Sequence, residues 1–315
     1  MIEAKSLTKL FGEKRVVDEV SFTVNKGEVL GFLGPNAAGK STTMRMLTGF
    51  LQPSSGTALI GGSDIRENSL DARAKIGYLP ENAPVYPDMP VTAFLEFCAS
   101  IRGFSGAGKK KAVEATIEKS FLTEVRNQTV GTLSKGYKQR VCFAQSILHD
   151  PEYLIFDEPT DGLDPNQKHE VRTMITQMGQ KKAIILSTHI LEEVDAVCTR
   201  AIIIANGRIV ADDTPEGLRA MSSVHNALSV TLLAPAGAEG VAVQVEKLPG
   251  VEKVRVMDSQ DKRITLRVFG KKDEPGLQDQ IVHYTAQTGL KLESLFRETG
   301  RLDEVFRNIT TTNKQ

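Results

Sequence analysis

A short loop near the start of the chain has the residue types and spacing that phosphate binding requires. Residues 34–41 read GPNAAGKS. Backbone N–H groups of such a loop wrap a β-phosphate, the lysine reaches the β- and γ-phosphates, and the serine hydroxyl binds Mg²⁺. A strand pattern precedes the loop and a helix pattern follows it, so we predict a nucleotide site rather than a glycine turn that merely starts a helix. Its residues are Gly34, Pro35, Asn36, Ala37, Ala38, Gly39, Lys40, Ser41 and Thr42.

Two adjacent carboxylates, Asp157 and Glu158, follow the apolar run YLIF, which is typical of a buried strand. Ligands bind at the carboxyl ends of parallel strands, where both carboxylates would lie. Asp157 suits a Mg²⁺ role, usually through water, and Glu158 suits a general base that deprotonates an attacking water. Successive residues of a strand point to opposite sides, so the two can serve different tasks. The alternative is a solvated turn at the strand end, which Pro159 and Gly162 would also suit.

Two further stretches carry less specific patterns. AIILSTH places His189 after another apolar strand, where it would hydrogen-bond a γ-phosphate and position the attacking water, although a structural histidine is the alternative. LSKGYKQR at 133–140 begins a helix, with Ser134 as a favourable N-cap. A helix start beside a glycine is an anion site, because its free N–H groups and its dipole point outward. The chain thus has a second phosphate site, and the residues alone do not say whose phosphate it holds.

Hydrophobic patterns predict the elements that position these residues. Strands are expected at Val16–Val24, Glu28–Leu33, Thr57–Ile60, Ile76–Leu79 and in the runs YLIFD, AIILS and AIIIA. Helices are expected after the phosphate loop, from Ser134, after Pro165 and from Ile190, and residues 90–150 are expected to form an inserted helical subdomain. Continuously apolar strands that alternate with helices predict a parallel sheet covered on both faces, and hence an α/β fold.

Length and composition limit the class of protein. With 315 residues, 40% hydrophobic and 25% charged, the chain suits a globular protein of two domains. Lys+Arg and Asp+Glu both number 39, which argues against a general nucleic-acid or anionic-membrane binder. The N-terminus lacks the apolar core of a signal peptide, and no run reaches the roughly 20 apolar residues of a membrane span. We expect a cytoplasmic protein, and any link to a membrane would come through a partner.

The pattern changes after about Met221. The runs ALSVTLLA, VEKVRVMD, RITLRVF and LKLESLFR are strand-like, whereas AEGVAVQVEKL and GLQDQIVHYTAQTG are helix-like. Their order, βαββαβ, is typical of a ferredoxin-like α+β fold. We therefore predict two domains, 1–221 with the motifs described above and 222–315 as an accessory C-terminal domain.

In this order the motifs resemble the nucleotide-binding subunit of ABC transporters over about residues 1–220. GPNAAGKST resembles the Walker A loop, YLIFDE resembles Walker B, DGLD at 161–164 resembles the D-loop, and STH at 187–189 resembles the switch histidine. The resemblance implies a P-loop NTPase of the ABC type, with an antiparallel β subdomain and a helical subdomain beside the core sheet. It also implies ATP and Mg²⁺ as ligands, stacking of adenine on Phe11, and a nucleotide contact by Asp164. A core phenylalanine is the alternative for Phe11.

The stretch LSKGYKQR resembles the family's signature motif, usually LSGGQ. Such cassettes work as head-to-tail dimers. The resemblance therefore implies that Ser134 and the backbone of Gly136 hold the γ-phosphate of an ATP bound to the Walker A loop of a second copy. It also implies that hydrolysis loosens the dimer.

Four positions depart from the family's usual residues. Ala37 stands where glycine is more common, and we expect it to be tolerated if its φ stays negative. Glu81 stands where the family's Q-loop has a glutamine that touches Mg²⁺; a carboxylate can still bind that ion, although a strand-end turn beside Pro80 is the alternative. Lys135 would add positive charge beside the phosphate, and the effect of Tyr137 in place of glutamine stays open.

The ending LESLFRETGRLDEVFRNIT resembles accessory domains on ATPases of ABC-2-type exporters, which pair with separate polytopic permeases. We expect the motor of such an exporter, of the drug, polysaccharide or gliding-motility type, on the cytoplasmic face of a membrane and without a nucleic-acid partner. The alternative is a soluble ABC-type ATPase acting on ribosomes or nucleic acid, against which the single cassette and the lack of sustained heptads argue. A P-loop GTPase or kinase would not account for LSKGYKQR or STH. The cargo, the permease, the direction of transport and the role of the tail stay open.

Overall fold

The computed structural model describes residues 1–82, 84–233, 238–260, 263–271 and 276–312. The chain divides into two compact units: Met1–Pro215 together with the end of the chain from Phe306, and Glu216–Val305. The predicted boundary at 221/222 lies shortly after the first division. The second division falls within the last helix, which we had expected to belong wholly to the C-terminal domain.

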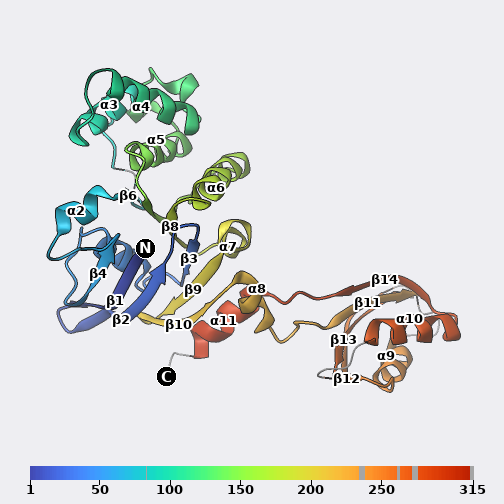
Figure 1. Ribbon diagram of the computed structural model, residues 1–315. Coiled ribbons are helices and arrows are strands. Elements are labelled where there is room, and N and C mark those ends of the chain that lie inside the picture. Colours follow the sequence, from blue (N-terminus) through green and yellow to red (C-terminus); the bar gives the residue numbers. More distant parts are fainter. Residues whose placement is uncertain (83, 234–237, 261–262, 272–275, 313–315) are drawn as a thin grey trace. The chain divides into compact units, whose positions relative to one another are not determined.

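A six-stranded sheet forms the centre of the first unit (Figure 1). Its order is β10-β9-β3-β8-β7-β6, with parallel pairing from β9 to β6 and an antiparallel edge strand, β10. The strands are β3 (Val29–Leu33), β6 (Ile76–Leu79), β7 (Tyr153–Asp157), β8 (Ala183–Thr188), β9 (Arg200–Ala205) and β10 (Arg208–Asp213). Every residue of β3, β7 and β8 is buried, because both faces of the sheet are covered. The predicted core sheet is confirmed.

A second, antiparallel sheet has the order β2-β1-β4-β5. Its strands are β1 (Ile2–Phe11), β2 (Lys14–Val24), β4 (Ser55–Ile60) and β5 (Ser63–Asp64). The sequence patterns missed β1. Register shifts interrupt its pairing with both neighbours and Ser6 has a φ of 46°, so the regular alternation of side chains breaks inside the strand.

One helix, α1 (Lys40–Leu47), shares a hydrophobic cluster with both sheets. Met44 and Met46 are fully buried there, together with Leu7 of β1 and Phe32 of β3. Packing on both sheets fixes the helix, and the phosphate loop stands at its N-terminus.

The other face of the core sheet is covered by α6 (Pro165–Gly179) and α7 (Leu191–Val197). Alternate residues of one strand serve the two faces. Ile155 belongs to the cluster around α1, whereas its neighbours Leu154 and Phe156 pack in the cluster with α6. Packing on both faces thus fixes the ends of β7 and β8, where the candidate catalytic residues lie.

The helices between β6 and β7 form a group of their own (Figure 1). They are α3 (Val91–Ile101), α4 (Gly106–Lys119) and α5 (Lys135–Ile147), with two short 3₁₀ turns, η1 (Thr123–Val125) and η2 (Val130–Thr132). Their shared core includes Phe94, Ile117 and Val141. The predicted helical subdomain is therefore present.

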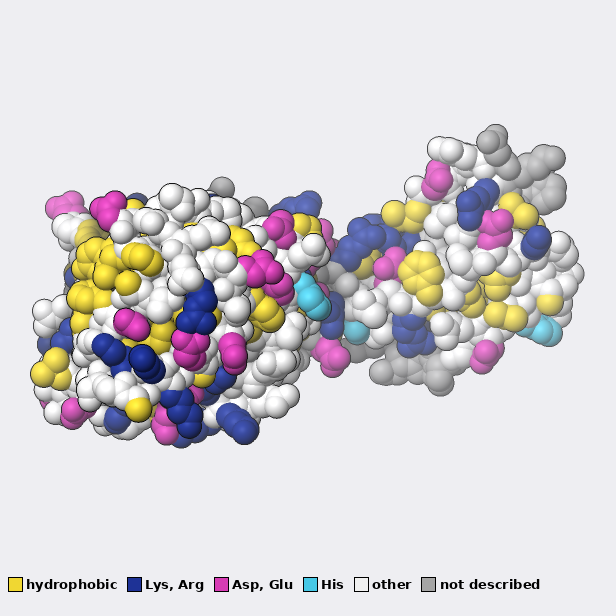
Figure 2. Space-filling model, turned by 90° about the horizontal axis from the view of Figure 1, so that it is seen from above, with side chains coloured by type: hydrophobic (Ala, Val, Ile, Leu, Met, Phe, Trp, Pro, Cys, Tyr) yellow, Lys and Arg dark blue, Asp and Glu magenta, His cyan; other side chains and the backbone are white. Residues whose placement is uncertain are grey.

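Three further helices are α2 (Ser69–Ala74), α8 (Pro215–Ala220) and α11 (Leu302–Thr312). Within the described part of the chain, no helix combines the length and the apolar character needed to cross a membrane. On the face of the first unit shown in Figure 2, Lys and Arg side chains are interspersed with Asp and Glu.

The second unit contains an antiparallel sheet of order β12-β13-β11-β14. Its elements are β11 (Leu228–Leu233), α9 (Ala238–Glu246), β12 (Val251–Gln260), β13 (Arg263–Gly270), α10 (Leu277–Thr288) and β14 (Lys291–Arg297). Leu266 of β13 and Ile281 of α10 belong to one buried cluster, so α10 packs on the sheet. This sheet order and the βαββαβ sequence of elements confirm the predicted ferredoxin-like fold.

Candidate functional site

The phosphate loop connects β3 to α1 and leaves no room for side chains at two of its glycines. Gly39 has a φ of 109°, and a Cβ there would come within 2.8 Å of the Val16 carbonyl oxygen. A Cβ on Gly34 would come within 2.6 Å of the Ile204 carbonyl oxygen. The loop is therefore held between β2 and β9 by close backbone packing, and glycine is required for that approach.

Ala37 does not meet the condition that we set for it. We expected the alanine to be tolerated if its φ stayed negative, but Ala37 has a φ of 65°, in the left-handed region. An L-residue with a Cβ pays roughly 1–2 kcal/mol for this conformation relative to glycine. The chain thus keeps the loop geometry that glycine would adopt freely and stores local strain there.

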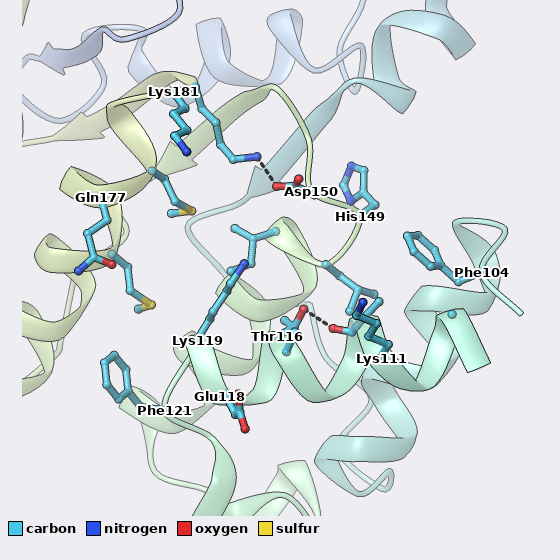
Figure 3. Close-up of a pocket in the computed structure, with 18 of the residues that line it drawn as sticks. Phe104, Lys111, Thr116, Glu118, Lys119, Phe121, His149, Asp150, Gln177 and Lys181 are labelled. Carbon is cyan, nitrogen blue, oxygen red and sulfur yellow. Dashed lines mark hydrogen bonds and ion pairs between the residues drawn. The ribbon is translucent and has the colours of Figure 1, made fainter. Parts of the chain in front are cut away.

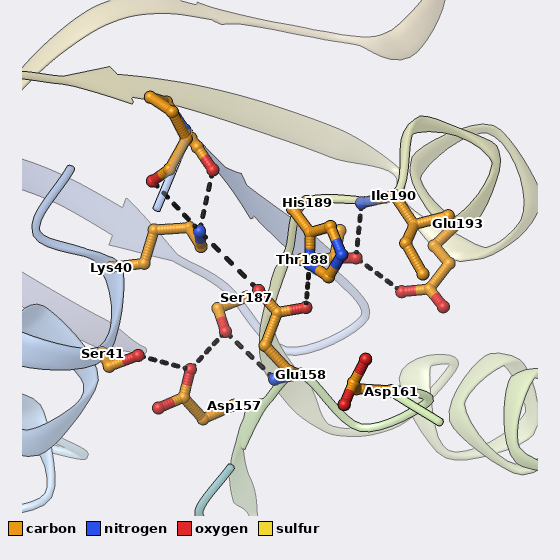
Figure 4. A network of polar contacts seen from close by, with 12 residues as sticks. Lys40, Ser41, Asp157, Glu158, Asp161, Ser187, Thr188, His189, Ile190 and Glu193 are labelled. Atoms are coloured by element: carbon orange, nitrogen blue, oxygen red, sulfur yellow. Dashed lines mark hydrogen bonds and ion pairs between the residues drawn. The ribbon is translucent and has the colours of Figure 1, made fainter. Parts of the chain in front are cut away.

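The ammonium of Lys40 lies inside the loop and faces Glu158, which follows the end of β7 (Figure 4). It donates to the carbonyl oxygen of Gly34 at 2.7 Å and to that of Pro35 at 3.4 Å. Its Nζ also lies 3.7 Å from Glu158 Oε1, and the side chain is only 6% exposed. A cation already desolvated and aimed into the loop is suited to meet phosphate oxygens.

Ser41 and Asp157 meet beside the loop, from the start of α1 and the end of β7. Ser41 Oγ donates to Asp157 Oδ1 over 3.1 Å, and Ser187 Oγ donates to the same oxygen over 2.5 Å. The second carboxylate oxygen, Asp157 Oδ2, is buried and has no hydrogen-bond partner among the described residues. A hydroxyl and an unsatisfied buried carboxylate oxygen are hard oxygen donors, so this pair fits Mg²⁺.

Glu158 follows Asp157 but does not continue the strand. Its φ of 51° turns the chain, which corrects our expectation that strand alternation alone would separate the two carboxylates. The turn is held by the Glu158 N–H, which donates to the carbonyl oxygen and to Oγ of Ser187. As a result Asp157 faces Ser41, whereas Glu158 faces Lys40 and His189.

The carboxylate of Glu158 lies between two basic groups. Its Oε2 is 2.9 Å from His189 Nδ1, on the side away from Lys40. Burial raises the pKa of Glu158, and the nearby His189 and Lys40 offset part of that rise. A carboxylate with a raised pKa is a stronger base than an ordinary surface glutamate.

Thr188 and Glu193, which we did not predict, hold the backbone beside His189 in place. Thr188 Oγ1 donates to Glu193 Oε2 over 2.7 Å and accepts the Ile190 N–H over 3.0 Å (Figure 4). The backbone on both sides of His189 is therefore tied to α7. Glu193 is 1% exposed, and burial raises its pKa. No pattern in LEEVDAV distinguishes Glu193 from the exposed Glu192 beside it.

A cavity of about 660 Å³ lies against the phosphate loop. Of the predicted residues it includes Asn36, Ala37, Gly39, Lys40, Ser41, Thr42, Glu81 and Glu158. Glu81 thus lies on the wall of the same cavity as Ser41. The lining also contains Lys14, Arg15, Val16, Asn206 and Gly207, which we did not single out. The pair Asn-Gly after an apolar strand is a turn signal that was available in the sequence.

Phe11 lies at the end of β1, paired with Lys14 of β2. Its side chain is 51% exposed, so it is not the core phenylalanine that we named as the alternative. Lys9 Nζ lies 5.3 Å from the centre of its ring. The ring is thus available for a contact next to the cavity wall formed by Lys14.

The signature stretch begins α5, as predicted, and Ser134 is its N-cap. Ser134 Oγ accepts the Tyr137 N–H over 3.3 Å. Asp164 caps α6 in a reciprocal pattern with Gln167, and a Cβ on Gly136 would come within 2.1 Å of Gln167 Oε1. The starts of α5 and α6 are therefore packed together. Neither Ser134 nor Gly136 is among the described residues that line the cavity at the phosphate loop.

The phosphate loop lies between a parallel strand, β3, and a helix, α1, and the acidic pair lies at the end of β7 in the same sheet. This arrangement defines a P-loop nucleotide-binding protein. Comparisons with known proteins narrow this class. A family model described as "ABC transporter" matches residues 17–161. A solved ATP-binding subunit of an ABC transporter has a TM-score of 0.65 and 30% identity, and the match covers 70% of this chain and 92% of that one. A dimeric ATP-binding cassette solved with ADP and Pi has a TM-score of 0.63 at 21% identity, which shows the fold.

Curated relatives agree with the family model. The probable multidrug ABC transporter ATP-binding protein YbhF of Escherichia coli K12 is 37% identical over 224 residues, 71% of this chain but only 39% of that protein. Nod factor export ATP-binding protein I of Paraburkholderia xenovorans is 36% identical over 81% of this chain and 83% of its own length. Linearmycin resistance ATP-binding protein LnrL of Bacillus subtilis 168 is 31% identical over 98% of both. The chain belongs to the ATP-binding proteins of the ABC transporter family.

Proposed function

We propose that the chain is the ATP-hydrolysing motor of an ABC exporter, acting with a second copy of itself and a separate membrane permease. The observation that carries this proposal is the position of Glu158, 3.7 Å from Lys40 Nζ and 2.9 Å from His189 Nδ1 at the end of the core sheet. One carboxylate thereby adjoins both a phosphate-binding lysine and an orienting histidine. Family membership and the names of the relatives support the transport role.

In the proposed reaction Lys40 donates to the β- and γ-phosphates of ATP. Glu158 takes a proton from a water molecule as the water oxygen forms a bond to the γ-phosphorus, and the bond from that phosphorus to the bridging oxygen breaks. ADP and inorganic phosphate leave. His189 orients Glu158 through their hydrogen bond. Mg²⁺ held by Ser41 and Asp157, with Glu81 on the cavity wall, would neutralise charge on the phosphates.

A second copy of the chain would complete the site. Ser134 lies at the start of α5, exposed and outside the phosphate-loop cavity of its own chain, so its hydroxyl is available to a nucleotide carried by another copy. Gly136 lies two residues further on and would contribute its backbone. In this arrangement Phe11 stacks on adenine, and Asp164, which caps α6, lies beside the shared nucleotide. ATP would then join two copies, and its hydrolysis would release them.

The permease would dock beside the helical subdomain, on the cytoplasmic face of the membrane. Tyr86, Phe97 and Ile101 are large apolar residues that are 55%, 39% and 69% exposed, and Tyr86 stacks edge-on against Phe97. All three follow Glu81 in the sequence, and Glu81 lies on the wall of the phosphate-loop cavity. The segment that would contact the permease is therefore continuous along the chain with a residue of the nucleotide site. No nucleic-acid partner is proposed, because equal numbers of basic and acidic residues argue against a general nucleic-acid binder.

Glu158→Gln tests the chemistry. The variant should bind ATP, lose turnover by at least about 100-fold, and accumulate an ATP-bound dimer, because the amide cannot accept the proton. Glu67→Gln, an exposed carboxylate elsewhere in the first unit, is the matched control and should behave as wild type. Near-normal turnover in Glu158→Gln would contradict the assigned role.

Recovery of the tagged chain from gently solubilised membranes tests the partner. We expect a stoichiometric polytopic membrane protein in the purified complex, identified by mass spectrometry. Consistent recovery with ribosomes or another soluble assembly, without a permease, would overturn the transport role while leaving the ATPase assignment intact.

A further inference from the structure

A second cavity, of about 840 Å³, lies in the first unit and shares no lining residue with the cavity at the phosphate loop (Figure 3). Its walls come from α4, from the end of α5 with the residues that follow it, and from α6 with the turn before β8. The volume lies in the range of cavities that hold small organic ligands. Nothing in the proposed ATP chemistry uses these residues.

The inner wall of this cavity is apolar. Leu148 and Met174 are buried, while Ile147 and Met178 are partly buried beside them. Met174 and Met178 are one helical turn apart on α6, so they present neighbouring thioethers to the same space. Methionine side chains adapt their shape to a ligand at low cost. This wall therefore suits a flexible hydrocarbon chain.

The rim of the cavity is basic. Lys111 and Lys119 come from α4 and Lys181 from the turn after α6, and within the described part of the chain none of the three pairs with an acid. Figure 3 shows Lys119 extending from α4 toward the side that carries Lys181, whereas Glu118 leaves the other side of the helix. Two acids, Glu118 and Asp150, also line the cavity, and Asp150 already pairs with Lys182 at 2.6 Å.

His149, which also lines the cavity, adds no positive charge at neutral pH. Burial, together with the nearby Arg102, lowers the pKa of His149 to about 4. His149 instead hydrogen-bonds the Ile76 carbonyl oxygen at 3.1 Å through Nε2. The charge that a ligand meets is therefore that of the lysine ammonium groups, which are solvated and free to move toward it.

We propose that this cavity is a binding site for an anionic amphiphile with one acidic head and a single hydrocarbon chain. The head, a carboxylate or a phosphate, pairs with Lys119 and Lys181, and the chain lies over Met174, Met178 and Leu148. A neutral lipid would leave the lysines without counter-charges, and a bare anion would leave the apolar wall uncovered. The occupant touches α4 and α6 together and so links the helical subdomain to the layer that covers the core sheet.

Calorimetric titration of the full chain with dodecanoate, below its micelle concentration, tests the site. We expect saturable binding of one molecule per chain. Dodecyl phosphate, titrated in parallel, separates a preference for either acidic head, and both are expected to bind. Dodecyltrimethylammonium, with the same chain and a cationic head, and acetate, with the head but no chain, should each bind at least about tenfold more weakly. Equal binding of the cationic and anionic amphiphiles would overturn the proposal.

Two variants place the ligand in the cavity. Lys119→Gln with Lys181→Gln should weaken dodecanoate binding by roughly fivefold to tenfold. The control pair, Lys110→Gln with Lys253→Gln, removes the same charge from exposed positions outside the cavity and should leave binding unchanged. Ala115→Trp, from an exposed position on the cavity wall, should block binding without disturbing the core. Undiminished binding in both the lysine pair and Ala115→Trp would show that the amphiphile binds elsewhere and would refute the site.

Discussion

Two places in the chain have the chemistry of a phosphate site: the phosphate loop with the adjoining ends of β7 and β8, and the start of α5. A single chain completes only the first. At the loop, Lys40 and Asp157 are 6% and 0% exposed, and each is fixed by partners from other elements. At the start of α5, Ser134 and Lys135 are exposed, and the Lys135 ammonium pairs with Asp161 at 3.0 Å on the surface. The first site is preorganised within the chain, whereas the second faces outward. This difference is the reason for our proposal that the active site is divided between two copies.

The largest expected effect comes from combining defects on the two sides. Lys40→Ala and Ser134→Arg should each reduce ATP turnover by at least about 100-fold when assayed alone. Mixed in equal amounts, they should regain a substantial part of the activity, because a mixed dimer has one site with intact Lys40 and intact Ser134. The measurement is ATPase activity of the mixture against each variant alone, with sizing to show the mixed dimer. A mixture that dimerises and stays as inactive as its components would rule out the divided site.

A smaller effect is expected from the support behind His189. Glu193→Ala should lower kcat roughly tenfold with little change in KM, because the backbone around His189 loses its anchor through Thr188. Glu193→Gln keeps an acceptor for the Thr188 hydroxyl and should stay near wild type. Steady-state kinetics of Glu193→Ala, His189→Ala and the double variant check the mechanism. If the two effects multiply instead of overlapping, Glu193 does not act through His189.

The fall of ATP turnover at low pH should depend on the phosphate-loop site and not on the start of α5. Glu158 must be ionised to accept a proton, and burial raises its pKa. Turnover should therefore fall as the pH drops through a value above the ordinary pKa of a glutamate, and recover as the pH rises. Glu193 also has a pKa raised by burial, so Glu193→Gln is the control and should retain this acid limb. Residual turnover in Glu158→Gln should lack it; an unchanged limb there would assign the titration to another group.

The smallest effect tests strain in the loop. Ala37→Gly should raise the free energy of unfolding by no more than about 1 kcal/mol, since relief of the left-handed conformation outweighs the extra freedom of glycine in the unfolded chain. Ala38→Gly is the matched control, because Ala38 is not among the residues with positive φ, and it should lower stability. Thermal or urea denaturation of the two variants decides the sign. A loss of stability in Ala37→Gly would show that the alanine methyl packs well enough to offset the strain.

Sequence patterns predicted the parallel core well, because strands buried on both faces leave continuous apolar runs such as YLIF. They failed where local geometry departs from regular repeats. β1 was missed because of its register shifts, and the turn at Glu158 is invisible to an argument based on strand alternation. The positive φ of Ala37 could not be read from the sequence either, since the residue type alone favours negative values.

The candidate site was predictable where a motif names its residues, as for Lys40 and Asp157. It was not predictable where a residue acts through a neighbour that only the fold supplies. Glu193 reaches Thr188 because α7 turns back on the end of β8, and Arg15 reaches the cavity because the antiparallel sheet brings β2 to the phosphate loop. Such contacts join segments whose separation in the sequence carries no periodic signal.

The close packing of Gly136 against Gln167 constrains how the sequence can vary. Because a Cβ at position 136 would lie 2.1 Å from the Gln167 side-chain oxygen, a larger residue at 136 requires a shorter one at 167. Gln167 in turn accepts the Asp164 N–H and completes the cap of α6. We therefore expect positions 136, 164 and 167 to covary: in an aligned set of relatives that share this fold, their residues should change together.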